Sequence, residues 1–191
     1  MSEIPPSGTK INSKILLRYL IDIETMNKGI IGIVIVLLVL VSGIYYGYYY
    51  FTTGVVNVYV QDPPTTQGYK IYLTISSIML HKVNASNDSW ITISNKTITI
   101  LLTSNMTFLA SSRIPSGEYN EIFLEISAAQ VQLGNINISA KIPSGVFKIH
   151  IINGMDLKGA SSQSLLISFP HITYTNGQII ISPSITAEVI S

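Results

Sequence analysis

The chain has 191 residues, of which 11% are charged, and its formal net charge is +1 at neutral pH. This length fits one folded domain plus a membrane anchor. The absence of cysteine excludes disulfides, thiolate metal sites and cysteine nucleophiles. Because the chain is nearly neutral, it lacks the positive surface of a nucleic-acid-binding protein, and we expect no nucleic-acid partner.

Residues 1–28 are expected to form a cytoplasmic tail. Within residues 13–26, the polar residues Lys14, Arg18 and Asp22 recur every four positions. This spacing is typical of an amphipathic helix that lies on the inner membrane surface. It equally fits a plain helical lead-in to the next segment, and the sequence leaves both interpretations open.

The segment from Gly29 to Tyr50 contains no charged residue and is rich in Ile, Val and Leu. A helix of about 22 residues rises about 1.5 Å per residue and reaches roughly 33 Å, enough to cross a hydrocarbon core of about 30 Å. Aromatic residues crowd its C-terminal end, where amphipathic rings prefer the headgroup level. The sequence therefore predicts a transmembrane helix over residues 29–51, with an outer aromatic belt and membrane lipid as its partner.

Basic residues flank only one end of this segment. Four of them precede it: Lys10, Lys14, Arg18 and Lys28. The next basic residue is Lys70. Positive charge close to a span stays on the cytoplasmic side. We therefore predict a single-pass cell-membrane protein with a cytoplasmic N-terminus and an extracellular domain over residues 52–191.

Two alternatives involve processing of the N-terminal region. Residues 41–43, Val-Ser-Gly, fit a small-residue cleavage site, so a cleaved secretory signal is one alternative. Lys28-Gly29 before an apolar helix resembles the processing site of archaeal type IV pilin-like signals, in which a peptidase cuts after the glycine. In that second alternative the chain is a filament subunit processed after Gly29.

Two glycines of the apolar segment, Gly43 and Gly47, have the GxxxG spacing that lets membrane helices approach closely. We therefore take them as candidate helix-packing residues, through which the protein would join a larger membrane complex. Glycine is frequent in membrane helices in general, so a lipid-facing pair is the alternative.

Residues 52–191 show the period-two alternation of β-strands. Val56, Val58 and Val60 alternate with other residues, and further alternating runs follow along the chain. One later run changes parity at Ser76-Ser77, which predicts a β-bulge. Short strands at regular spacing, without a helical period, predict an all-β sandwich.

One short motif occurs twice. Residues 113–119 and 141–147 both read basic-Ile-Pro-Ser-Gly-x-aromatic. Proline presets φ and glycine adopts a positive φ, so each copy predicts a tight turn that begins a strand.

Five Asn-x-Ser/Thr sequons follow the apolar segment, and none precedes it. Their asparagines are candidate glycosylation sites: Asn84, Asn87, Asn95, Asn105 and Asn137. Glycans on this part of the chain would agree with an extracellular domain.

The sequence contains no constellation typical of a catalytic or metal site. His81, His150 and His171 fall on different predicted strands, and the alternation around His150 predicts that it faces outward. Glu121 and Glu125 share one predicted strand face, where we expect a solvated pair rather than a catalytic one. We therefore predict no enzyme activity, no metal and no cofactor.

Trp90 opens the predicted strand Trp90-Ile-Thr-Ile93. A tryptophan can stack on a sugar ring, but a lone tryptophan in a strand is more typical of a core. We therefore expect Trp90 to be a core residue.

Five segments carry a resemblance to a known family: Asn57–Pro63, Ile71–His81, Ser89–Ile93, Ile98–Leu102 and Ile114–Tyr119. In this order they resemble the opening strand with its corner, the long second strand and three later segments of the family called domain of unknown function 4382. That family occurs in lipoproteins and membrane-anchored proteins of bacteria and archaea. Ser89 stands where the family has glycine. The resemblance covers about residues 55–190 and implies a prealbumin-like or Ig-like sandwich on the cell surface, with no catalytic residues to carry over.

The expected function is that of a membrane-anchored cell-surface protein, acting as a scaffold, an adhesion protein or a partner-binding module without catalysis. Edge strands are natural partner sites, so we expect envelope or membrane-complex proteins as partners. A pilin-like filament subunit and an accessory subunit of a larger membrane complex are the alternatives.

Overall fold

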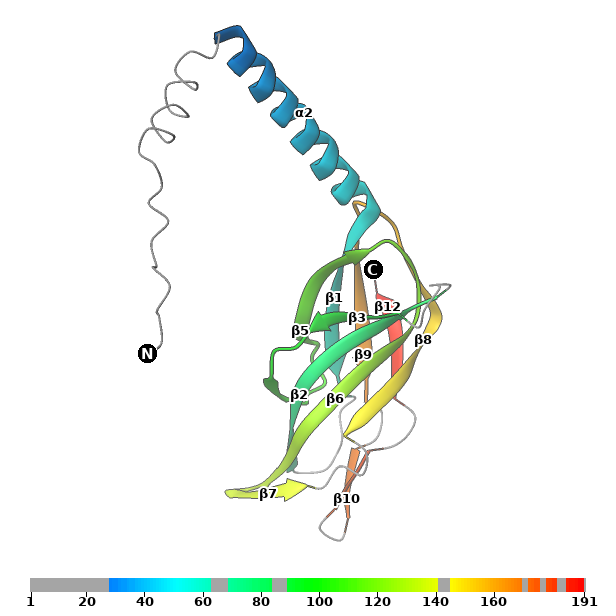
Figure 1. Ribbon diagram of the computed structural model, residues 1–191. Helices are drawn as coiled ribbons and strands as arrows, with labels where there is room; N and C mark the ends of the chain where they lie inside the picture. The colour runs from blue at the N-terminus through cyan, green and yellow to red at the C-terminus, as the bar shows by residue number, and fades with distance from the viewer. Residues whose placement is uncertain are drawn as a thin grey trace, which may run out of the picture. The chain divides into compact units, whose positions relative to one another are not determined.

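A computed structural model describes residues 28–62, 69–83, 89–140, 145–169, 172–175, 178–181 and 185–190 (Figure 1). The chain divides into two compact units, residues 1–47 and residues 48–191. The amphipathic helix predicted within residues 13–26 lies outside the described residues.

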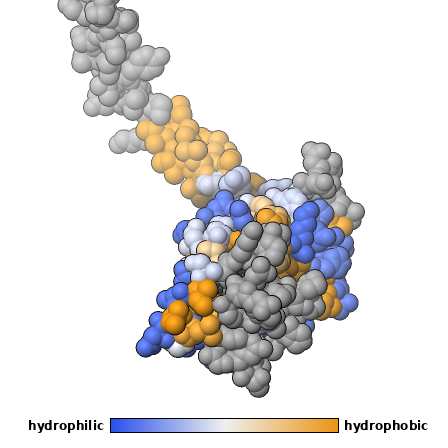
Figure 2. Space-filling model, turned by 90° about the horizontal axis from the view of Figure 1, so that it is seen from below, coloured by the Kyte–Doolittle hydropathy of each residue, from blue (hydrophilic) through white to orange (hydrophobic). Residues whose placement is uncertain are grey.

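Helix α2 spans Lys28–Thr52 and has an apolar surface (Figure 2). Its candidate membrane-spanning part, Gly29–Thr52, is 0% buried. Its length and composition fit a membrane anchor or a signal sequence. A side-chain carbon added at Gly43 or Gly47 would meet nothing within 4 Å. Both glycines therefore present open surface, and their role in helix packing stays a prediction.

The described chain after α2 consists mainly of β-strands, as the alternation predicts. Their bounds are β1 (Thr53–Gln61), β2 (Tyr69–Lys82), β3 (Ser89–Ser94), β4 (Ile98–Leu101), β5 (Thr107–Pro115), β6 (Gly117–Leu133), β7 (Ile136–Ala140), β8 (Val146–Leu157), β9 (Ser162–Ser168), β10 (Ile172–Thr175), β11 (Gln178–Ile181) and β12 (Thr186–Ile190). The prediction of an all-β domain preceded by one apolar helix is confirmed.

Ten of these strands form one curved sheet. Hydrogen-bonded neighbours follow the order β3-β2-β6-β8-β12-β9-β1-β5, while β4 pairs with β2 and β7 pairs with β6. The pairs β1–β9 and β8–β12 are parallel. The end strands β3 and β5 also lie beside each other, so the sheet nearly closes on itself (Figure 1). β10 and β11 form a separate hairpin.

Apolar side chains from alternate strand positions fill the space inside this sheet. In β1, Val56, Val58 and Val60 are each at most 1% exposed, as predicted. In β6, Ile122 and Leu124 are 0% exposed. Burial of one such side chain contributes roughly 1.5–3 kcal/mol, so this core is the main source of stability.

The predicted irregularity at Ser76-Ser77 is confirmed. The pairing of β2 with β6 shifts register between Ile75 and Ser77. Because a bulge changes which face the following residues point to, Ile75 and Ile78 both reach the core, at 0% and 2% exposure.

The first predicted tight turn, in residues 113–119, is also confirmed. β5 ends at Pro115, β6 begins at Gly117, and φ of Gly117 is 143°. A side-chain carbon there would be strained and would lie 2.6 Å from Cε of Lys82, which explains the glycine. In the second copy, residues 141–144 lie outside the described residues.

Candidate functional site

A groove of about 760 Å³ lies where the two ends of the ten-stranded sheet approach each other. One wall is the segment 92–98, which runs from β3 through the connecting loop into β4. The other wall is the segment 108–111 of β5. We call this space the seam groove.

The first wall is one edge strand with a break in it. β3 pairs with Ile78–Lys82 of β2, and β4 pairs with Tyr72–Ile75 of the same strand. β6 occupies the other edge of β2, so β3 and β4 follow each other along one edge. Residues 95–97 interrupt them opposite the bulge at Ser76-Ser77 and are exposed. Among the described residues, the outer edge of β3 and β4 has no further strand in its ladder.

The second wall, β5, is interrupted as well. Val58 of β1 pairs with Ala110, but the next residue, Tyr59, pairs with Phe108. Leu109 is therefore an extra residue, as in a β-bulge. β5 pairs with β1 through one edge, and in the described part of the chain its other edge lies beside β3 without a shared ladder. Two interrupted strand edges thus face each other across the groove.

The inner surface of the seam groove is apolar. Ile93, Leu109 and Ala110 line it and are 7%, 7% and 8% exposed. Phe108 is 50% exposed and packs edge-on against Tyr59, with 5.6 Å between the ring centroids. An exposed phenylalanine beside buried aliphatic residues offers a surface for the apolar side chain of a partner.

Apart from Ile98, the remaining lining is polar. Hydroxyl and amide groups come from Thr92, Ser94, Asn95, Thr97 and Ser111. Lys96 is the one charged residue among the described residues that line the groove. The described lining therefore contains hydrogen-bonding groups and a cation beside its apolar residues.

A second cluster lies on the outward face of the β3-β2-β6-β8 part of the sheet. Trp90 is half-buried there, with its ring centroid 5.0 Å from that of His81 and 5.7 Å from that of Phe123. The Nζ atom of Lys148 lies 5.5 Å from the Trp90 ring centroid.

The expectation that Trp90 belongs to the core is therefore wrong. In β3, the side chains of Ile91 and Ile93 point inward to the core. Trp90 is one position out of step with them, so its side chain points to the other face of the sheet.

Histidine and glutamate side chains border this cluster. The Nδ1 atom of His150 lies 3.9 Å from Oε1 of Glu121, and His150 is exposed, as predicted. His81 Nδ1 lies 2.8 Å from Oδ1 of Asn120. Glu125 is exposed on the same strand as Glu121, as predicted. Among the residues that the structure describes, no three His, Asp or Glu side chains form a group that could hold a metal ion.

We predict glycans on some of the five sequon asparagines, of which Asn95, Asn105 and Asn137 have exposed side chains that a glycosyltransferase can reach. Asn84 and Asn87 carry the same prediction but lie outside the described residues. Peptide mass spectrometry of native material, before and after deglycosylation, checks it. Two asparagines outside sequons, Asn120 and Asn153, are the control and should stay unmodified. Five bare sequons in native material would contradict the prediction.

A family profile described as "Domain of unknown function (DUF4382)" matches residues 53–183. The chain belongs to this family. The match confirms the resemblance carried by the opening strand, the long second strand and the Ile-Pro-Ser-Gly turn. It begins where α2 ends and covers strands β1 to β11.

No curated protein matches the DUF4382 chain. Two solved structures are distantly similar. One is described as a candidate cell adhesion protein from Bacteroides ovatus, with 8% identity, a TM-score of 0.25, and coverage of 73% of this chain and 46% of that chain. The other is the cytotoxin suilysin from Streptococcus suis, with 14% identity, a TM-score of 0.21, and coverage of 72% and 23%. The chain thus spans less than half of the length of either protein, and neither likeness carries an argument about its function.

Proposed function

We propose that this protein is a single-pass cell-membrane protein whose extracellular DUF4382 domain binds an extended segment of a partner protein in the seam groove. The binding involves no catalysis and no cofactor. One observation carries this proposal: two interrupted strand edges face each other across an apolar groove.

Strand edges recognise extended chains because they present rows of backbone N–H and C=O groups. A partner segment that runs along such an edge adds hydrogen bonds, and its alternate side chains point into the groove or to solvent. Here the inward side chains would contact Ile93 and Leu109. Side chains of the opposite parity would contact Phe108, which lies on the outward face of its strand with Tyr59. Because Lys96 is the one charged residue among the described lining residues, the segment we propose carries an acidic residue beside apolar ones.

We further propose that the domain is a two-layer sandwich of the prealbumin-like or Ig-like kind. Among the residues that the structure describes, the pairing between β8 and β12 consists of Ala187 and Ile151. Such short pairing between β8 and β12 supports a division of the sheet at this point. The two layers would then be β5-β1-β9-β12 and β4/β3-β2-β6-β8.

Site-specific photo-crosslinking in intact cells tests the binding proposal. A photoreactive residue at Ser111, in the groove, should yield an adduct with a defined partner. The same residue at Asn135, an exposed position between β6 and β7, should not. Lys96→Glu should lower the adduct yield roughly two- to fivefold, since an exposed ion pair contributes up to about 1 kcal/mol. Lys148→Glu, on the outward face, is the matched control. Equal adducts from Ser111 and Asn135, or none from Ser111, would overturn the proposal.

The anchor itself predicts an intact N-terminus. We expect the native protein to retain Lys28 and the residues before it, because the polar spacing before the apolar segment suits a helix on the inner surface. Intact-mass measurement of deglycosylated native protein checks this. A chain that begins at Ile30 would favour the pilin-like filament subunit instead.

The proposed extracellular position of the domain is tested separately. Protease added to intact cells should cleave within residues 52–191.

A further inference from the structure

The last turn of α2 is held by two turns of the β-domain. α2 ends at Thr52 and β1 begins at Thr53, so no linker separates the helix from the sheet. The two turns are residues 115–117, between β5 and β6, and residues 158–161, between β8 and β9. We call these two turns, together with Arg113, the helix clasp.

Backbone hydrogen bonds connect each turn of the helix clasp to the helix end. Ser116 donates from its N–H at 2.8 Å and from its Oγ at 3.0 Å to the carbonyl oxygen of Thr52. The N–H of Ala160 lies 3.1 Å from the carbonyl oxygen of Tyr50 and 2.9 Å from that of Thr53. The last carbonyls of a helix have no partner within the helix, so these contacts stabilise its end.

Arg113 of β5 supplies a positive charge at the same place. Its guanidinium carbon lies 5.5 Å from the centroid of the Tyr50 ring, and its Nη1 lies 3.4 Å from the carbonyl oxygen of Thr53. The last turn of α2 contains no basic residue of its own. A cation beside the negative end of a helix is favourable, so Arg113 compensates for that absence.

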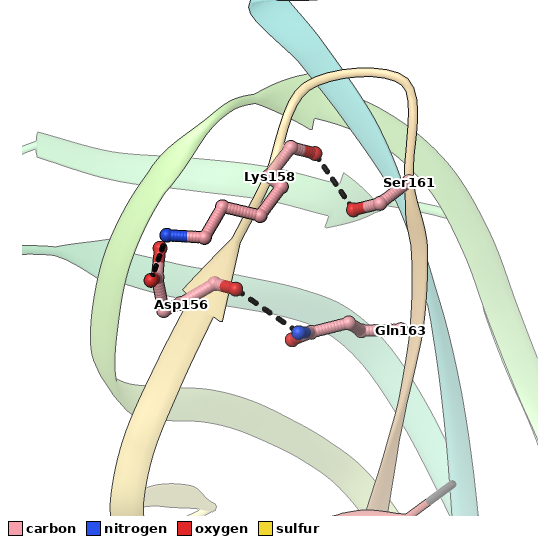
Figure 3. Close-up of polar contacts among 4 residues, drawn as sticks. All are labelled: Asp156, Lys158, Ser161 and Gln163. Carbon is pink, nitrogen blue, oxygen red and sulfur yellow. Dashed lines mark hydrogen bonds and ion pairs between the residues drawn. The ribbon is translucent and has the colours of Figure 1, made fainter.

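The turn between β8 and β9 is fixed by its own contacts (Figure 3). The Ser161 hydroxyl donates to the carbonyl oxygen of Lys158 at 2.7 Å, and Gln163 Nε2 donates to that of Asp156 at 3.0 Å. Lys158 forms an ion pair with Asp156, and this hydrogen bond raises the pKa of the lysine. The Lys158 side chain is 73% exposed, and its ammonium group lies back beside the Asp156 carboxylate rather than at the tip of the turn (Figure 3).

Apolar surface is exposed beside these charges. Tyr48 and Phe51 are 70% and 71% exposed, although both belong to the same compact unit as the clasp. Aromatic rings next to exposed Arg and Lys side chains are typical of protein surfaces at a membrane interface. There the rings enter the headgroup level and the cations contact phosphates.

We propose that the helix clasp is a lipid-binding surface, and that Arg113 and Lys158 contact the phosphates of the outer leaflet while Phe51 enters the headgroup layer. This inference rests on the proposed membrane anchor. It follows from chain continuity, because Tyr50 and Thr52 close the apolar segment and the clasp contacts both of them. The turns therefore lie at the depth at which the span leaves the membrane.

Depth measurement with single-cysteine labels tests the inference. The natural chain has no cysteine, so each introduced thiol is unique. The full chain would carry a fluorophore at Lys158→Cys, at Asn135→Cys or at Val39→Cys. It would be reconstituted in vesicles of equal parts phosphatidylcholine and phosphatidylglycerol. Nitroxide lipids then quench from the headgroup or from the middle of the acyl chain, and the fluorescence of the single tryptophan, Trp90, reports that each variant is folded.

We expect the headgroup nitroxide to quench the label at position 158 at least about threefold more strongly than the label at position 135. Equal quenching at these two positions, with the label at position 39 quenched by the acyl-chain nitroxide, would overturn the lipid-binding surface and leave the anchor intact. No acyl-chain quenching at position 39 would overturn the anchor, and the inference with it.

Discussion

Replacing Gly159 by alanine is expected to cost about 3 kcal/mol or more of the free energy of unfolding, near the upper end for overpacking. An added Cβ would lie 1.6 Å from the carbonyl oxygen of Phe51 and 2.5 Å from its carbonyl carbon. These are backbone atoms, so no side-chain rotation relieves the clash. Either the turn between β8 and β9 or the end of α2 must move, and the hydrogen bonds of Ala160 are then lost.

Urea unfolding of the full chain in detergent micelles, followed by the fluorescence of Trp90, measures this cost. Gly134→Ala is the control. Gly134 has a φ of 59°, and its added Cβ would meet nothing within 4 Å. Alanine there costs only the conformational strain, about 1–2 kcal/mol. A Gly159→Ala variant as stable as Gly134→Ala would show that the helix end is not held as described.

The strand pattern in the sequence predicts much of this fold, because burial on one face of a sheet imposes a period of two. The valines of β1 and the bulge at Ser76-Ser77 follow directly from that rule. The turn at Pro115 and Gly117 follows from the backbone preferences of those two residue types. In each case the determining interaction involves residues that are close in sequence.

Strands β5 and β12 are harder to predict, for reasons visible in their residues. In β5, Leu109 and Ala110 are adjacent and both buried, because the bulge opposite Tyr59 breaks the alternation. In β12, Ala187 is the buried side chain, and one alanine gives little hydrophobic signal. These strands complete the sheet, and β5 is one wall of the seam groove, so the groove could not be predicted without them.

The candidate sites depend on strand order, which a single sequence does not encode locally. Trp90, His81 and Phe123 meet only because β3, β2 and β6 are neighbours. The outward position of Trp90 could nevertheless have been predicted, because Trp90 and Ile93 differ in parity along the strand. The prediction followed the general preference of tryptophan for cores instead. The helix clasp likewise joins Thr52 to a turn more than sixty positions later, as the contact with Ser116 shows.

Tyr119 should make the domain lose stability in alkali. Its side chain is 0% exposed, and its hydroxyl donates to the carbonyl oxygen of Pro115 at 2.6 Å. Burial raises the pKa of Tyr119 to about 12 from its ordinary value near 10. Between these two pH values the unfolded chain releases the phenol proton while the folded chain keeps it. Rising pH therefore favours unfolding in this window, by up to about 3 kcal/mol.

The variant Tyr119→Phe isolates this effect, because both proteins share every other titrating group. At neutral pH the variant should be less stable by about 1 kcal/mol, since the carbonyl group of Pro115 loses its hydrogen-bond donor. Near pH 12 the wild-type protein must keep a buried phenol protonated or bury a phenolate, and the variant does neither. The difference in unfolding free energy should therefore shrink above pH 10 and reverse in favour of the variant before pH 12. Urea unfolding of both proteins across this range measures it. A difference that stays constant with pH would mean that Tyr119 ionises equally in the folded and unfolded chains.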